Sequence, residues 1–232
     1  MKRPGMTHDA ILLWRRKRRQ YSSFCFLTAH AGVIVCHVPH NRLRYMKRAG
    51  SLQPFARLFV TIAESGGYRE AEQIDPQRRS GVDTWDPETA AYLAFVGVCI
   101  EMFFSDGSTD ARLFHLTEEF ARAIAIKPVD KAVVIFGWQL MHLAGFLPTG
   151  EALHGVSGER VRTEIGALIG RPVSADCMAG IEKLTAYRWE RNEPLQLERT
   201  IWDEAERTLF AYAEAQAERE IPCLRFLRDV RI

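Results

Sequence analysis

Three side chains between positions 115 and 119 are of the types that bind metal ions. His115, Glu118 and Glu119 are three and four positions apart, so on a helix they share one face. An imidazole and two carboxylates so placed can hold Zn²⁺ or contribute to a di-metal centre. The competing interpretation is the solvent-facing side of an amphipathic helix. A metal-dependent helical protein is therefore one hypothesis, and no other cofactor is expected.

Two more polar side chains interrupt strongly apolar stretches of the chain. Glu101 and His142 each lie within a segment that is otherwise apolar. A charge in such a place needs a partner, because burying it alone costs free energy. We expect each to be paired, to lie at the rim of the core, or to serve as a further metal ligand.

An unbroken run of five basic residues stands near the N-terminus. Such a run neutralises nucleic-acid phosphates and releases their counterions. The residues are Arg15, Arg16, Lys17, Arg18 and Arg19. One hypothesis is therefore a basic arm that binds nucleic acid.

A second nucleic-acid candidate spans residues 159–191, where two predicted helices flank a short turn. The second helix carries Lys183, Arg188 and Arg191, and segment 187–192 resembles the end of a helix-turn-helix. The surrounding sequence is net acidic, which opposes binding to phosphates. A DNA-binding regulator that uses this unit or the basic arm is the alternative to the function favoured below.

The motifs of common enzyme classes are missing from the sequence. No glycine-rich phosphate loop with its lysine and no dinucleotide fingerprint is present. The segment 155–159 lacks the spacing of a nucleophile elbow. The sequence therefore leans against an enzyme and offers no catalytic residue.

The cysteines and the apolar runs bear on location. Five cysteines, an odd number without metal-finger spacing, favour a reduced cytoplasmic setting. The longest apolar runs reach only about 15 residues, which is short for a membrane span. We expect a cytoplasmic protein without a membrane span.

Aromatic residues occur on more than one side of the last long predicted helix, residues 195–220. They are Trp202, Phe210 and Tyr212. An apolar residue outside the main stripe indicates a second contact surface. The sequence therefore predicts a protein partner or a homodimer.

The net charge of +2 conceals an uneven distribution of charge. Residues 1–50 hold eleven Lys and Arg against one Asp, whereas the rest holds 20 basic and 28 acidic residues. Such an asymmetry indicates an unlike segment joined to a domain. Besides a basic arm, residues 1–45 allow a targeting signal, with a basic stretch before the apolar run 24–38, or a gene start placed too early, with Met46 as the true start. We predict a basic, poorly ordered N-terminal extension over 1–45, whose place in the native fold stays open.

From residue 52 onward a 3.6-residue apolar period predicts helices separated by Pro and Gly. Asp86, Pro87 and Glu88 form a strong helix start. We predict an all-α fold, an irregular bundle of about six to seven helices in a single domain over 46–232, with a loop at 66–85. The expected helices cover 52–64, 87–104, 110–126, 130–146, 159–169, 175–191 and 195–220.

The function favoured by these observations is a non-catalytic helical module for protein interaction or regulation. The composition, rich in Ala and Arg, suits a bacterial cell with a GC-rich genome. Nucleic-acid binding is expected only through the basic arm or residues 159–191.

Overall fold

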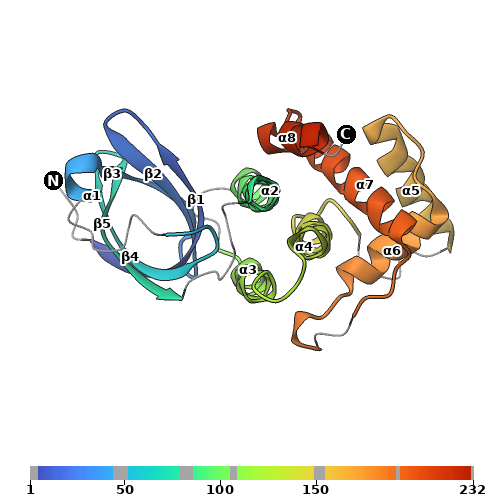
Figure 1. Cartoon of the computed structure of the whole chain (residues 1–232), viewed down its shortest axis with the longest axis horizontal. Helices are drawn as coiled ribbons and strands as arrows, with labels where there is room; N and C mark the ends of the chain where they lie inside the picture. The colour runs from blue at the N-terminus through green and yellow to red at the C-terminus, as the bar shows by residue number, and fades with distance from the viewer. Residues whose placement is uncertain are drawn as a thin grey trace. The chain divides into compact units, whose positions relative to one another are not determined.

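The structure is a computed structural model that describes residues 5–43, 52–78, 86–104, 109–148, 155–191 and 194–230. The chain divides into two compact units, Met1–Ile126 and Lys127–Ile232, and each is described by itself. The first unit contains a closed β-barrel (Figure 1). The all-α prediction is therefore wrong, because this is a mixed fold of a barrel and helices.

Five strands close the barrel in the order β1-β2-β3-β5-β4. Antiparallel pairing of β1 with β4 closes it, and β3 and β5 form the parallel pair. A short helix, α1 (His40–Leu43), follows β3. The strands are β1 (Met6–Lys17), β2 (Tyr21–Thr28), β3 (Gly32–Pro39), β4 (Arg57–Ser65) and β5 (Tyr68–Arg78). Residues 6–39, predicted as a poorly ordered extension, thus supply three of the five strands.

Alternate residues of each strand form the apolar interior of the barrel. Phe24 and Phe26, two positions apart on β2, stack with ring centroids 5.9 Å apart. Burial of these side chains removes apolar surface from water, which stabilises the barrel. The buried cluster comprises Ala10, Leu12, Phe24, Phe26, Ile34, Cys36, Val38, Leu58, Val60, Ile62, Ala71 and Ile74.

A bulge in β1 reverses the direction of the side chains that follow it. The pairing with β2 shifts between Leu12 and Trp14. A bulge adds one unpaired residue, so the alternation of faces moves by one position. Beyond the bulge, Arg15 pairs with Phe24 and Lys17 pairs with Ser22. Phe24 and Ser22 are completely buried. Opposite residues of an antiparallel pair share a face, so Arg15 and Lys17 lie on the interior side.

A tight hairpin joins β4 to β5 where the sequence predicted a helix stop and a loop. Gly66 and Gly67 both have positive φ, 58° and 78°, and Ser65 pairs with Tyr68. Two residues with positive φ form the type I′ turn that matches strand twist. The predicted helix over 52–64 is instead largely β4, and most of the predicted loop over 66–85 is β5. The remainder of that loop, residues 79–85, lies outside the described residues.

Two helices of the first unit, α2 (Pro87–Phe103) and α3 (Ala111–Ala123), begin where the sequence predicted. Asp86 caps α2 by accepting from Thr89 N at 2.9 Å, and Asp110 caps α3. Gly97 allows α2 to approach β1 closely, because a Cβ there would lie 2.9 Å from Leu13 O. This contact buries the middle of β1 on both faces.

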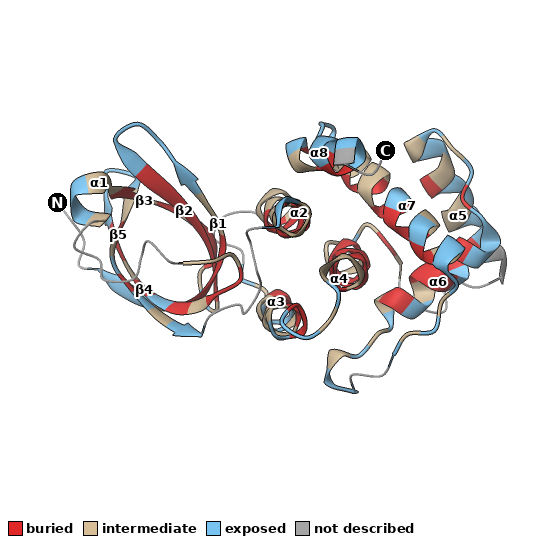
Figure 2. Ribbon diagram, in the orientation of Figure 1, coloured by how far each residue is buried: buried red, intermediate tan, exposed pale blue. Residues whose placement is uncertain are grey.

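The second unit consists of helices packed around α4 (Val129–Leu143) and α7 (Arg199–Ala217). Buried residues run along α4, α6 and α7 (Figure 2). Trp138 donates its indole N–H to Ala205 O at 3.2 Å and stacks on Tyr212. The remaining helices are α5 (Gly155–Ile169), α6 (Ala175–Thr185), the 3₁₀ turn η3 (Trp189–Arg191) and α8 (Pro222–Val230). Within the described residues, no helix is both long enough and apolar enough to cross a membrane.

Candidate nucleic-acid interface

A row of side chains crosses four strands on the outer face of the barrel. Arg16 of β1 is opposite Ser23 of β2, and Ser23 is opposite His37 of β3. The His37 ring then lies against the Tyr68 ring of β5, with centroids 5.3 Å apart. Residues opposite each other in antiparallel strands share a face, so this row points away from the core.

Three rings in this region form what we call the aromatic row: Tyr21, His37 and Tyr68. The Tyr21 and His37 rings meet edge to face at 5.0 Å, and His37 and Tyr68 are inclined by only 29°. Tyr21 is 37% exposed and Tyr68 is 46% exposed. Ser23 Oγ lies 3.1 Å from His37 Nδ1, which holds the imidazole in place. The aromatic row therefore presents accessible ring surface from three strands.

A cavity of about 550 Å³ adjoins the aromatic row. Partial burial raises the pKa of the Tyr68 phenol above its ordinary value of 10.0, and the nearby Glu70 and Tyr21 raise it further. The phenol is therefore neutral at physiological pH. A neutral ring can stack on a base without repelling a phosphate. The lining residues are Val33, Val35, His37, Glu64, Gly67, Tyr68, Arg69 and Glu101.

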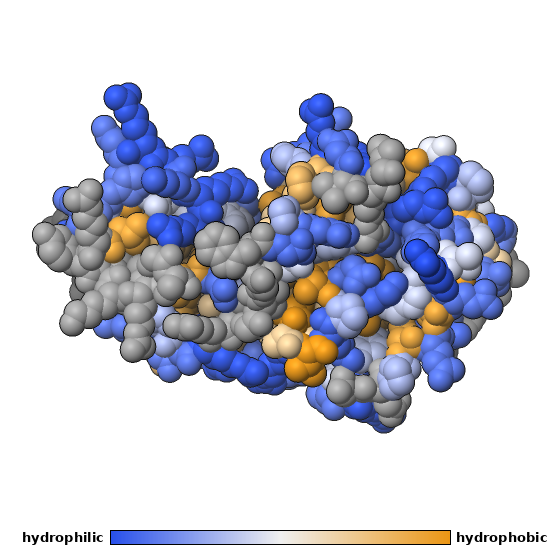
Figure 3. Space-filling view, viewed as in Figure 1, coloured by the Kyte–Doolittle hydropathy of each residue, from blue (hydrophilic) through white to orange (hydrophobic). Residues whose placement is uncertain are grey.

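The predicted basic run lies at the β1–β2 hairpin, which we call the basic hairpin (residues 15–21). Lys17, Arg18 and Arg19 are exposed, and Arg18 N donates to Tyr21 O at 2.8 Å to close the turn. Strongly hydrophilic side chains project from the barrel strands in the space-filling view (Figure 3). The hairpin ends at Tyr21, so it brings Arg18 and Arg19 next to the aromatic row, whereas Lys17 lies on the interior side of the barrel.

The other predicted nucleic-acid residues lie in the second unit. Lys183, Arg188 and Arg191 are exposed and line a cavity of about 310 Å³. Helix α6 ends at Thr185, so Arg188 and Arg191 follow the helix and do not lie on it. Gln139 anchors their segment by donating to Tyr187 O at 2.7 Å. The helix-turn-helix arrangement expected for 159–191 thus lacks two of its basic residues on the second helix.

The predicted metal ligands are engaged in ion pairs within the first unit. Glu118 pairs with Arg57 and, at 3.0 Å, with Arg122, and Glu119 also pairs with Arg122. His115 is exposed. Among the residues that the structure describes, no group of three or more His, Cys, Asp or Glu is placed to hold a metal ion.

The two polar residues in apolar helices have separate partners. Glu101 accepts from Trp14 Nε1 at 2.8 Å, whereas His142 Nδ1 lies 3.2 Å from Leu147 O. Of the three possibilities given by the sequence, the structure shows a separate hydrogen-bond partner for each side chain. Glu101 belongs to the first unit and His142 to the second.

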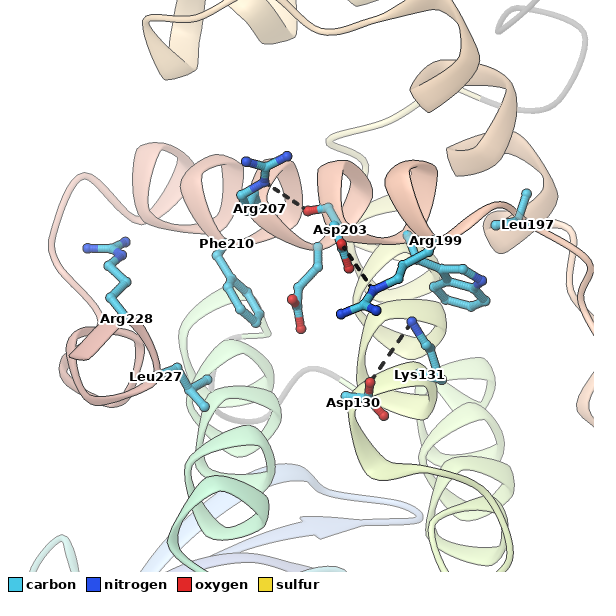
Figure 4. A pocket seen from close by; sticks show the side chains of 11 residues that line it. Asp130, Lys131, Leu197, Arg199, Asp203, Arg207, Phe210, Leu227 and Arg228 are labelled. Atoms are coloured by element: carbon cyan, nitrogen blue, oxygen red, sulfur yellow. Dashed lines mark hydrogen bonds and ion pairs between the residues drawn. The ribbon is translucent and has the colours of Figure 1, made fainter. Parts of the chain in front are cut away.

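Two of the three aromatic side chains predicted to form an interface are buried within the second unit. Trp202 is 8% exposed and Tyr212 is 5% exposed, and Tyr212 donates to Phe146 O at 2.8 Å. Phe210 is half-buried. Trp202 and Phe210 line a cavity of about 1070 Å³, toward which side chains of α4, α7 and α8 converge (Figure 4).

Neither Cys177 nor Cys223 is an activated nucleophile. Burial, with a smaller contribution from Glu204, raises the pKa of the Cys177 thiol to about 12. Burial likewise raises the pKa of the Cys223 thiol to about 11. Both thiols are therefore protonated at neutral pH, whereas the thiolate is the reactive form.

Comparison with models of known protein families finds no match to this chain, and a search of curated proteins finds no significant relative.

Proposed function

We propose that the barrel binds single-stranded nucleic acid through the aromatic row and the basic hairpin. The observation that carries this proposal is their juxtaposition on one side of the barrel, with Tyr21 common to both. Proteins that bind single strands combine cationic side chains along the backbone with aromatic rings on which bases stack. Duplex DNA hides the faces of its bases, so exposed rings favour an unpaired strand.

The topology of the barrel supports the same proposal. The closed order β1-β2-β3-β5-β4, with β3 parallel to β5, resembles the oligonucleotide- and oligosaccharide-binding (OB) barrel. Such barrels use the face of strands 2 and 3 and the loops 1–2 and 4–5 for binding. Here those places carry Tyr21 and His37, the basic hairpin, and the Gly66–Gly67 turn beside Tyr68. This likeness is an analogy at the level of the fold.

The charge of the hairpin favours oligonucleotides over neutral sugars. Each phosphate neutralised by Lys or Arg releases counterions, so binding strength falls with salt. Arg18 and Arg19 sit at the exposed tip, where they can reach a backbone without desolvation.

The test is fluorescence anisotropy with labelled oligothymidine and with a duplex, each at low and at physiological salt. We expect Arg18→Gln/Arg19→Gln to reduce the steepness of log affinity against log salt by about 1.4 on the single strand, which is about 0.7 for each lost phosphate contact. Tyr68→Ala should weaken binding by about 1–3 kcal/mol, the usual contribution of one stacked base. Arg160→Gln/Arg199→Gln removes two equally exposed cations from the second unit and serves as the matched control.

Two outcomes would contradict the proposal. One is equal weakening by the hairpin pair and by the control pair, which would indicate a general effect of charge. The other is preference for the duplex, combined with loss of binding in Lys183→Gln/Arg188→Gln. That result would favour the regulator predicted from residues 159–191.

A protein-interaction role is a second candidate, favoured by the cavity of about 1070 Å³ in the second unit. Its wall includes the half-buried Phe210 and the buried Leu227, with charged side chains such as Arg199 and Asp203 around them. We propose that a second copy of the chain inserts an apolar side chain here. Sedimentation velocity over a wide concentration range tests this: Phe210→Ser should abolish a dimer that Arg160→Gln keeps. A parent protein that stays monomeric would exclude self-association.

A further inference from the structure

A second, smaller cavity lies at the end of the barrel interior, separate from the aromatic row on the outer face. Its volume is about 360 Å³. The lining residues are Arg15 and Lys17 of β1, Ser22 of β2, and His40 and Leu43 of α1. The bulge after Leu12 turns Arg15 and Lys17 to this side, where they pair with Phe24 and Ser22. The barrel interior is thus capped by a polar layer at this end.

Two polar atoms in this layer have no hydrogen-bond partner among the described residues. Ser22 is completely buried, and its Oγ is unsatisfied, as is Nε2 of His40. Buried polar groups in proteins are almost always hydrogen-bonded, and the exceptions indicate a missing ligand, ion or water. Both atoms belong to residues that line the same cavity. A single polar group in this cavity that reached both atoms would satisfy them.

The charge of the lining selects an anion for that place. Arg15 and Lys17 both contribute positive charge, and the described lining contains no carboxylate. The guanidinium of Arg15 also lies 5.4 Å from the Phe24 ring, which holds it at the edge of the core.

The donor set matches the oxygens of a phosphoryl group. A guanidinium, an ammonium, a hydroxyl and an imidazole N–H approach from β1, β2 and α1, so they surround the cavity from different directions. Hydrogen bonds from cationic donors to phosphate oxygens are short and strong. Two cations suit a doubly charged phosphate monoester better than a singly charged diester.

We infer that Arg15, Lys17, Ser22 and His40 form a binding pocket for a phosphate monoester at the mouth of the barrel. The terminal phosphate of a nucleic-acid strand is one source, and that part rests on the proposed function. Inorganic phosphate or a free nucleotide has the same chemistry and needs no strand. The two sources are separated by the experiment.

The experiment measures the melting temperature of the full chain with inorganic phosphate, and with chloride and sulfate at equal ionic strength. Phosphate should raise the melting temperature of the parent more than chloride does, and sulfate, a dianion of the same shape, should act in the same direction. Ser22→Ala and Lys17→Gln should each abolish at least half of that excess. Ser22→Ala should fold as well as the parent, because the hydroxyl that it removes has no partner in the free protein. Arg160→Gln, which removes an exposed cation of the second unit outside the cavity, should keep the full excess.

A second arm compares oligothymidine that carries a 5′-phosphate with the same strand ending in a 5′-hydroxyl. The parent should prefer the phosphorylated strand by about tenfold, and Ser22→Ala should lose that preference. A phosphate excess over chloride without this preference supports the pocket for free phosphate, even if no strand binds at all. Equal responses to phosphate, sulfate and chloride, or an unchanged phosphate excess in Ser22→Ala and Lys17→Gln, overturn the inference. In that case strand binding that still depends on Tyr68 would leave the proposed function standing.

Discussion

The indole N–H of Trp14 donates to Glu101 Oε2 across 2.8 Å and so joins strand β1 to helix α2. Arg16 covers the Trp14 ring at 4.0 Å, and its guanidinium lies 3.7 Å from Glu101. A carboxylate in an apolar helix is stabilised only when such partners compensate for lost hydration. This cluster explains why a glutamate interrupts the most apolar helix of the chain.

Replacing Trp14 with Phe should lower the free energy of unfolding by about 1–3 kcal/mol, since Glu101 loses a donor in a partly buried place. Glu101→Gln keeps an oxygen acceptor and should cost less. Urea denaturation of both single variants and the double variant measures the coupling. Strictly additive losses would show that the two side chains do not interact.

Gly97→Ala should destabilise the first unit, although Ala is the better helix former. Helix propensity alone predicts a gain of up to about 1 kcal/mol. The added Cβ, however, would lie 2.9 Å from the backbone oxygen of Leu13, which cannot move without disturbing β1. Thermal unfolding decides between the two effects: a higher melting temperature would mean that α2 does not approach β1 this closely.

The buried thiol of Cys177 should make stability fall in alkaline solution. Its pKa is about 12 in the folded chain against an ordinary value of 9.0. Above pH 9.0 the unfolded chain releases this proton while the folded chain retains it, so ionisation favours unfolding. The free energy of unfolding should drop by about 1.4 kcal/mol per pH unit in that range, beyond the drop in a Cys177→Ala variant. Urea unfolding from neutral pH to about pH 10, in the presence of a reductant, tests this, and parallel curves for parent and variant would contradict it.

A chain that starts at Met46 should fail to form the barrel. It lacks β1, β2 and β3 and keeps only β4 and β5, and an isolated hairpin is marginally stable in water. Far-UV circular dichroism and limited proteolysis should show loss of strand signal and rapid cleavage within residues 57–78. A truncated chain in which residues 57–78 resist proteolysis would contradict this prediction.

The helices were largely predictable because their signals are local. Asp86 caps α2 as the sequence indicates, and the predicted bounds of the helices α3, α4 and α7 agree with the structure to within a few residues. The strands were not predictable in the same way. Leu58, Phe59 and Ile62 have helical spacing, yet Leu58, Val60 and Ile62 alternate and face the core. In β1 the bulge breaks the alternation, and in β2 burial on both faces removes it.

The candidate site was predictable only in part. The basic run is evident in the sequence and suggests an arm, whereas in the structure it forms the end of β1 and the turn that follows. Tyr21, His37 and Tyr68 were missed because they are far apart in the chain and meet only through the pairing of β2 with β3 and of β3 with β5. One signal was available: Gly66–Gly67 between apolar alternations is typical of a hairpin.

By itself the sequence determined the helix cap at Asp86, the need of Glu101 for a partner, and the concentration of positive charge near the N-terminus. These depend on residue type and on neighbours within one or two turns of chain. Only the tertiary structure decided that residues 6–39 are strands of a closed barrel and that Arg15, Lys17, Ser22 and His40 share one cavity. Pairing between distant strands decides which face of the sheet each residue takes, and a single bulge reverses that face. Local periodicity therefore predicts neither the closed barrel nor the set of residues that line this cavity.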